Sequence, residues 1–98
     1  MFGQKKIYVD LSSVKDEKEL HTALKSALDN DGYTGENLDA LHDVLTGICK
    51  KTILTVTGFD AFARELDTYA EKLALVLAVS ASENRALTVV FDKKGRRK

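Results

Sequence analysis

Three short segments with the alternation of a β-strand lie far apart in the chain, and this spacing limits the folds open to it. They cover residues 5–11, 53–57 and 87–91 and are rich in branched and aromatic residues. The stretches between them are too long for hairpin turns and lack strand alternation. Strands joined by helical crossovers run parallel, so we predict a three-stranded parallel sheet with right-handed connections.

The first long stretch begins with signals for a helix. Asp16 and Glu19 have the spacing of a capping box, and apolar residues follow at the helical period, which predicts a helix over residues 17–29. The run Asn30-Asp31-Gly32 would end it, because Asn and Gly tolerate the left-handed conformation.

Three further helices complete the predicted fold. Asn37 would cap a second helix over residues 37–46, and residues 59–66 and 69–82 favour helix as well. The order β-α-α-β-α-α-β places the chain in the α/β class, with four helices flanking the sheet. The apolar side of the second helix consists of Leu38, Leu41, Val44, Leu45 and Ile48.

We predict one domain over residues 1–92 and a basic, disordered tail over residues 93–98. The chain of 98 residues is 44% hydrophobic, contains no proline, and is long enough for a modest core. Its formal net charge is zero, and five of the last six residues are Lys or Arg, so residues 1–92 carry 0 − 5 = −5. We expect the tail to be solvated and not to bind nucleic acid.

Several features predict a cytoplasmic protein without cofactor or metal. The lone Cys49 has no partner within the chain, and no charged-then-apolar leader precedes the first strand. The longest apolar run, Leu73–Val79, is far shorter than the roughly 20 residues of a membrane span. No Gly-rich phosphate loop or metal-ligand cluster is present in the sequence.

The window from Ser26 to Cys49 is strongly acidic and contains no Lys or Arg. Asp39 and Asp43 fall four residues apart in the second helix, a spacing that costs a few tenths of a kcal/mol between like charges. Two interpretations remain open from composition, a merely solvated helix face or a binding surface for a basic partner. The carboxylates of this window are Asp29, Asp31, Glu36, Asp39 and Asp43.

The segment Tyr33–Gly47 reads YTGENLDALHDVLTG and resembles the signature segment of the barstar family, intracellular inhibitors of guanyl-specific ribonucleases such as barnase. A weaker likeness extends over residues 5–91. The resemblance implies a three-stranded parallel sheet flanked by four helices, which agrees with the order predicted from periodicity. It also implies that the chain is an inhibitor and not an enzyme.

The resemblance further implies roles for single residues. Asp43 would occupy the site of a substrate phosphate. A cleft that binds RNA holds cationic hydrogen-bond donors, and a desolvated carboxylate can accept their hydrogen bonds in place of the phosphate. Asp39 would meet a neighbouring arginine or backbone site, and Tyr33 would stack over the catalytic histidine region. The close-packed backbone around them would come from Asn37, Leu38 and Gly47.

The chain also departs from the family pattern. Thr34, His42 and Ile48 replace aromatic contact residues, and Val79 replaces a glutamate, whereas a second family glutamate is kept as Glu83. The predicted partner-binding residues are therefore Tyr33, Thr34, Asn37, Leu38, Asp39, His42, Asp43, Thr46, Gly47, Ile48, Cys49 and Glu83.

Some residues in and near this set have more than one interpretation. Gly47 is either only the glycine that ends the helix or also a point where a partner approaches the backbone. His42 is a contact residue, a pH-sensitive element or an exposed spacer. We expect Cys49 to be a partly buried small hydrophobe and His21 to be structural.

Three functional classes follow. The first is an inhibitor that binds a basic secreted ribonuclease as a 1:1 complex. The second is a barstar-like interaction module for a different phosphate-binding protein or toxin, which the lost aromatic residues leave open. The third, a thiol enzyme using Cys49, His42 and Asp39, conflicts with geometry, because residues 42 and 49 of a continuous helix lie about 10 Å apart along its axis.

Overall fold

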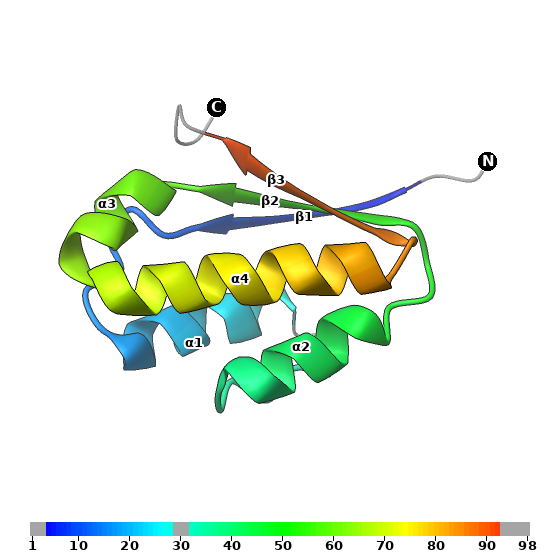
Figure 1. The fold of residues 1–98 in the computed structure, drawn as a ribbon, viewed down its shortest axis with the longest axis horizontal. Coiled ribbons are helices and arrows are strands. Elements are labelled where there is room, and N and C mark those ends of the chain that lie inside the picture. The colour runs from blue at the N-terminus through cyan, green and yellow to red at the C-terminus, as the bar shows by residue number, and fades with distance from the viewer. Residues whose placement is uncertain (1–3, 29–31, 93–98) are drawn as a thin grey trace.

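The computed structural model describes residues 4–28 and 32–92, which form a single parallel sheet with four helices. The strands β1 (Lys5–Asp10), β2 (Thr52–Thr57) and β3 (Leu87–Asp92) lie in the order β1-β2-β3 and are all parallel (Figure 1). The predicted sheet is therefore confirmed. The tail 93–98 and most of the predicted helix stop at Asn30-Asp31-Gly32 lie outside the described residues.

The helices follow the predicted order with small shifts of their ends. They are α1 (Glu17–Ala27), α2 (Leu38–Thr46), α3 (Phe59–Glu65) and α4 (Asp67–Glu83). The capping signal before α1 is confirmed, because the Asp16 carboxylate accepts the Glu19 N–H at 2.8 Å. No helix in the described ranges is both long and apolar enough to cross a membrane.

The helices build layers on the sheet that place α2 away from the strands. α1 packs against β1, α4 packs against β3, and α2 packs mainly against α4 (Figure 1). Ile7 and Leu54 face the helices and are buried, whereas Tyr8 on the opposite face is 65% exposed. The outer position of α2 leaves its polar side open to solvent.

Local sequence explains why α2 begins and how it is anchored. Asn37 has an extended backbone, and its side-chain oxygen accepts the Ala40 N–H at 2.8 Å, as predicted for an N-cap. Its carbonyl accepts the first helical hydrogen bond from the Leu41 N–H at 3.1 Å. Leu41 and Leu45 are fully buried, so two turns of the apolar side hold the helix on the core.

We expect Leu45→Ala to reduce the free energy of unfolding by about 2–5 kcal/mol, since it removes a fully buried side chain and leaves a cavity. Urea denaturation measures this value. The matched control is Leu75→Ala, because Leu75 is 64% exposed and its loss should change stability by no more than about 0.5 kcal/mol. Equal effects of the two substitutions would contradict the described packing.

Candidate functional site

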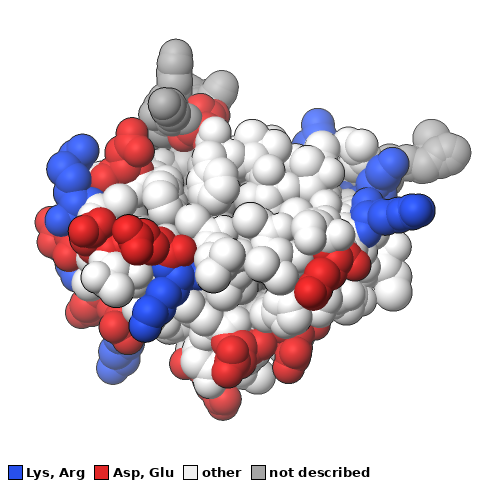
Figure 2. Space-filling model, viewed as in Figure 1, with Lys and Arg blue, Asp and Glu red and all other residues white. Residues whose placement is uncertain are grey.

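Two exposed carboxylates one helical turn apart dominate the polar side of α2. The Asp43 side chain is 86% exposed, and the Asp39 side chain is exposed and makes no hydrogen bond or ion pair with another described residue. Acidic side chains but no Lys or Arg lie over α2 in the view of Figure 2. This surface attracts cationic groups, and the pair has no cation on its own helix to offset its repulsion.

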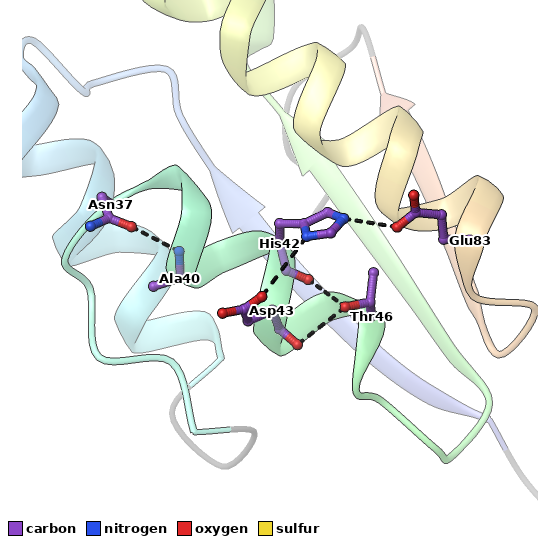
Figure 3. A network of polar contacts seen from close by, with 6 residues as sticks. All are labelled: Asn37, Ala40, His42, Asp43, Thr46 and Glu83. Atoms are coloured by element: carbon purple, nitrogen blue, oxygen red, sulfur yellow. Dashed lines mark hydrogen bonds and ion pairs between the residues drawn. The ribbon is translucent and has the colours of Figure 1, made fainter.

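A hydrogen bond joins this surface to the end of α4. The His42 Nε2 atom lies 2.9 Å from a carboxylate oxygen of Glu83, and the His42 Nδ1 atom lies 4.0 Å from Asp43 Oδ1 (Figure 3). His42 is 36% exposed and Glu83 53% exposed. The structure thus brings together residues that are 41 positions apart, and His42 lies between two carboxylates with a hydrogen bond to Glu83.

In the last turn of α2, a side-chain hydroxyl bonds to the helix backbone. The Thr46 hydroxyl donates to the His42 carbonyl at 2.8 Å and lies 3.3 Å from the Asp43 carbonyl (Figure 3). Gly47 is the C-cap, but its backbone is right-handed, with φ −90°, so no left-handed conformation requires glycine there. A Cβ at this position would lie 3.3 Å from the Asp43 carbonyl, one turn earlier in the same helix.

Asn84 is a structural residue of the site that the sequence analysis missed. Its side-chain amide donates to the carbonyls of Leu45 and Ile48, both at 2.9 Å, and its side-chain oxygen accepts the Ala86 N–H at 2.9 Å. These bonds tie the end of α2 to the turn that follows α4. The only sequence signal is an Asn just beyond a predicted helix, which usually indicates a turn and nothing more.

The structure corrects the role expected for Tyr33. Its side chain is only 3% exposed and belongs to the core, so its ring offers no surface on which a partner could stack in this conformation. Its hydroxyl lies 2.5 Å from His21 Nδ1 and 3.3 Å from the Asn37 carbonyl. Burial raises the pKa of Tyr33 to about 12, with smaller contributions from Tyr69 and Glu36.

His21 is buried beneath the loop that precedes α2, as expected for a structural histidine. Its Nε2 atom lies 2.8 Å from the Tyr69 hydroxyl, and its Nδ1 atom contacts the Tyr33 hydroxyl. Burial lowers the pKa of His21, and the nearby Glu17 carboxylate opposes this shift. Gly35 passes close by with φ +79°, and a Cβ there would lie 3.3 Å from the His21 carbonyl.

Cys49 is exposed, which makes the prediction of a partly buried residue wrong. It follows the end of α2, where its thiol contacts the Gly47 carbonyl at 3.5 Å. The imidazole of His42 is directed to Glu83 and not to this thiol, so the thiol–imidazole pair of an enzyme is not formed. In residues 4–28 and 32–92 no three His, Cys, Asp or Glu side chains are grouped to hold a metal ion.

The remaining predicted contact residues border the same surface. Thr34 and Asn37 are exposed at its start, whereas Leu38 and Ile48 are partly buried against the core. A hollow of about 730 Å³ lies beside the end of α2 and is bordered by Gly47, Ile48 and Cys49 together with two lysines, Lys5 and Lys50. The described surface therefore has an acidic centre on α2 and a basic edge at its end.

Comparison with known proteins gives the family of the chain. The family model described as "Barstar (barnase inhibitor)" matches residues 4–92. The chain belongs to the barstar family. A protein of Bacillus subtilis (strain 168) named "Putative ribonuclease inhibitor YrdF" is 34% identical over 80 residues, which cover 81% of this chain and 88% of that protein. Barstar proteins are inhibitors, and the fold described above is the one expected for the family.

We expect Asn84→Ala to reduce the free energy of unfolding by about 1–3 kcal/mol, because it leaves two carbonyls at the end of α2 without their donor. Urea denaturation and the hydrogen exchange of residues at that end would measure the loss. The control is Ser82→Ala, an exposed position two residues earlier, in the last turn of α4. If both variants were as stable as the wild type, Asn84 would not hold the two elements together.

The buried His21 predicts a dependence of stability on pH. Its folded-state pKa is lowered from 6.5, so below about pH 6.5 the unfolded chain takes up a proton that the folded chain does not. The free energy of unfolding should therefore fall as the pH falls through this range, by at most about 1.4 kcal/mol per pH unit for one proton. His21→Gln should remove this contribution, and an unchanged slope would exclude His21 as its source.

Proposed function

We propose that this barstar-family chain is a cytoplasmic inhibitor that binds a basic, secreted, barnase-like ribonuclease as a 1:1 complex and blocks its active site. The acidic surface of α2 would enter the cleft, with Asp43 in the place of a substrate phosphate. Asp39 would meet a neighbouring cationic or backbone donor. The chain would then act by occupying a site, with no chemistry of its own.

The observation that carries this proposal is the pair of exposed carboxylates on a helix anchored at both ends. Asp39 and Asp43 stand on α2, whose start is capped by Asn37 and whose end is held by Asn84. Because the helix backbone is held at both ends, it needs little reordering on binding, which favours tight recognition of Arg and Lys donors. Family membership supports a ribonuclease as the protein that supplies those donors.

The bridge between His42 and Glu83 extends the proposed surface from α2 to α4. Glu83 keeps more than half of its side chain exposed while one oxygen is bonded to His42. Its other oxygen is available to a cation at the edge of the cleft. His42 would thus hold Glu83 in place for a contact with the partner. In the family, this position supplies an aromatic contact instead.

Asp43→Asn should raise the inhibition constant for a barnase-like ribonuclease by about 30-fold or more, because it removes the charge but keeps the shape of the side chain. The control is Asp60→Asn, which removes the same charge from an exposed side chain of α3. Asp60 lies before the start of α4, whereas Glu83 of the proposed surface lies at the end of α4. This helix has 17 residues and is about 25 Å long. Equal inhibition by Asp43→Asn and the wild type would exclude the phosphate-mimic role.

A second candidate function is an interaction module for another phosphate-binding protein or a toxin. It is favoured by the loss of aromatic contact area, since Tyr33 is buried and positions 34, 42 and 48 carry no Phe, Tyr or Trp. Such a partner would still bind through Asp39 and Asp43. Binding that depends on both aspartates, without inhibition of guanyl-specific ribonucleases, would support this candidate over the first.

A further inference from the structure

Three side chains from different elements meet beneath the loop before α2. Tyr69 comes from α4, His21 from α1, and Tyr33 from the loop itself. The Tyr69 hydroxyl lies 2.8 Å from His21 Nε2, and the Tyr33 hydroxyl lies 2.5 Å from His21 Nδ1 and 3.3 Å from the Asn37 carbonyl. His21 and Tyr33 are buried, so water cannot readily replace these contacts.

The number of available protons gives these contacts a direction. The Tyr33 hydroxyl has one proton, and the Asn37 carbonyl can only accept. If that proton is donated to Asn37, His21 Nδ1 must carry a proton and donate it to the Tyr33 oxygen. His21 Nε2 is then unprotonated and accepts the proton of Tyr69, so every contact is a hydrogen bond.

The opposite tautomer satisfies fewer groups. If the Tyr33 hydroxyl donated to His21 Nδ1, the Tyr33 oxygen would face the Asn37 carbonyl with no proton between them. Two acceptors would then lie 3.3 Å apart in a partly buried site, which is unfavourable. The geometry therefore favours neutral His21 with its proton on Nδ1.

The chain of bonds ends on the residue that starts α2. The Asn37 carbonyl also accepts the Leu41 N–H, and the Asn37 side chain caps Ala40. We propose that the bonds from Tyr69 through His21 and Tyr33 to Asn37 fix the first turn of α2, which makes His21 and Tyr69 positioning residues for partner binding. The statement about binding rests on the proposed function, but the statement about α2 does not.

Several charged groups surround the series of hydrogen bonds from Tyr69 through His21 and Tyr33 to Asn37. Glu17, Lys18 and Lys25 of α1 and Glu36 of the loop border a groove of about 440 Å³ that reaches His21, while α4 contributes Tyr69. Protonation of His21 at Nε2 turns this atom into a donor, so Tyr69 can no longer donate to it. The Tyr69 oxygen can then accept from Nε2, while the bonds from Nδ1 to Tyr33 and from Tyr33 to Asn37 keep their direction, so the order at the start of α2 should survive the titration of His21.

The first test is made on the free chain by nitrogen NMR of the His21 ring and by amide hydrogen exchange. We expect the wild type to carry its ring proton on Nδ1 at neutral pH. In Tyr69→Phe that preference should weaken, and exchange of the Leu41 amide, relative to Val56 of the central strand, should rise about twofold to tenfold. Tyr8→Phe is the matched control, because Tyr8 is 65% exposed on the far face of the sheet.

A double-substitution experiment separates positioning from general destabilisation. Tyr33→Phe cuts the link to Asn37, so adding Tyr69→Phe should produce no further rise in the relative exchange of Leu41. Independent structural damage would instead give additive effects. A wild-type His21 protonated on Nε2, equal exchange in Tyr69→Phe and Tyr8→Phe, or additive effects would each overturn the proposal.

The second test uses a barnase-like ribonuclease and the full chain. Tyr69→Phe should increase the dissociation rate about twofold to tenfold, whereas Tyr8→Phe should leave it unchanged. A ribonuclease that does not bind the wild type would overturn the proposed function, and the NMR and exchange results would still decide the role of the chain of bonds. Binding by the wild type with no change in Tyr69→Phe would overturn the positioning role.

Discussion

The packing of α2 against α4 is the interaction on which the candidate site depends. Leu41 and Leu45 bury one side of α2, and this burial fixes which side faces solvent. The polar groups at the two ends of the helix then refine its position, through Asn37 at the start and Asn84 at the end. Two like charges at successive turns destabilise an isolated helix. The packing of α2 on the rest of the protein offsets this repulsion between Asp39 and Asp43.

Much of the fold follows from the sequence alone. The strand and helix order, the Asp16 and Asn37 caps and the parallel sheet were all predictable, because they depend on periodicity and local hydrogen bonding. The acidic side of α2 was predictable for the same reason, since the helical period separates Asp39 and Asp43 from the leucines.

What the sequence did not reveal depends on contacts between distant residues. Tyr33 was expected to face a partner, but its ring is buried in the core, where its hydroxyl contacts His21 Nδ1 and the Asn37 carbonyl. The link between His42 and Glu83 and the bonds of Asn84 likewise join segments far apart in the chain. No local pattern encodes such pairs, and Cys49 was misjudged because its exposure depends on how α2 ends.

If α2 occupies the phosphate-binding cleft of a ribonuclease, as proposed, a nucleotide that binds the same cleft should compete with the chain. Calorimetric titration of a guanyl-specific ribonuclease with the wild-type chain would be repeated at increasing concentrations of guanosine monophosphate at constant ionic strength. If the two ligands share the cleft, the apparent dissociation constant of the chain should rise in proportion to the nucleotide once the cleft is saturated. If saturating nucleotide left the affinity unchanged, α2 would not occupy the phosphate-binding cleft.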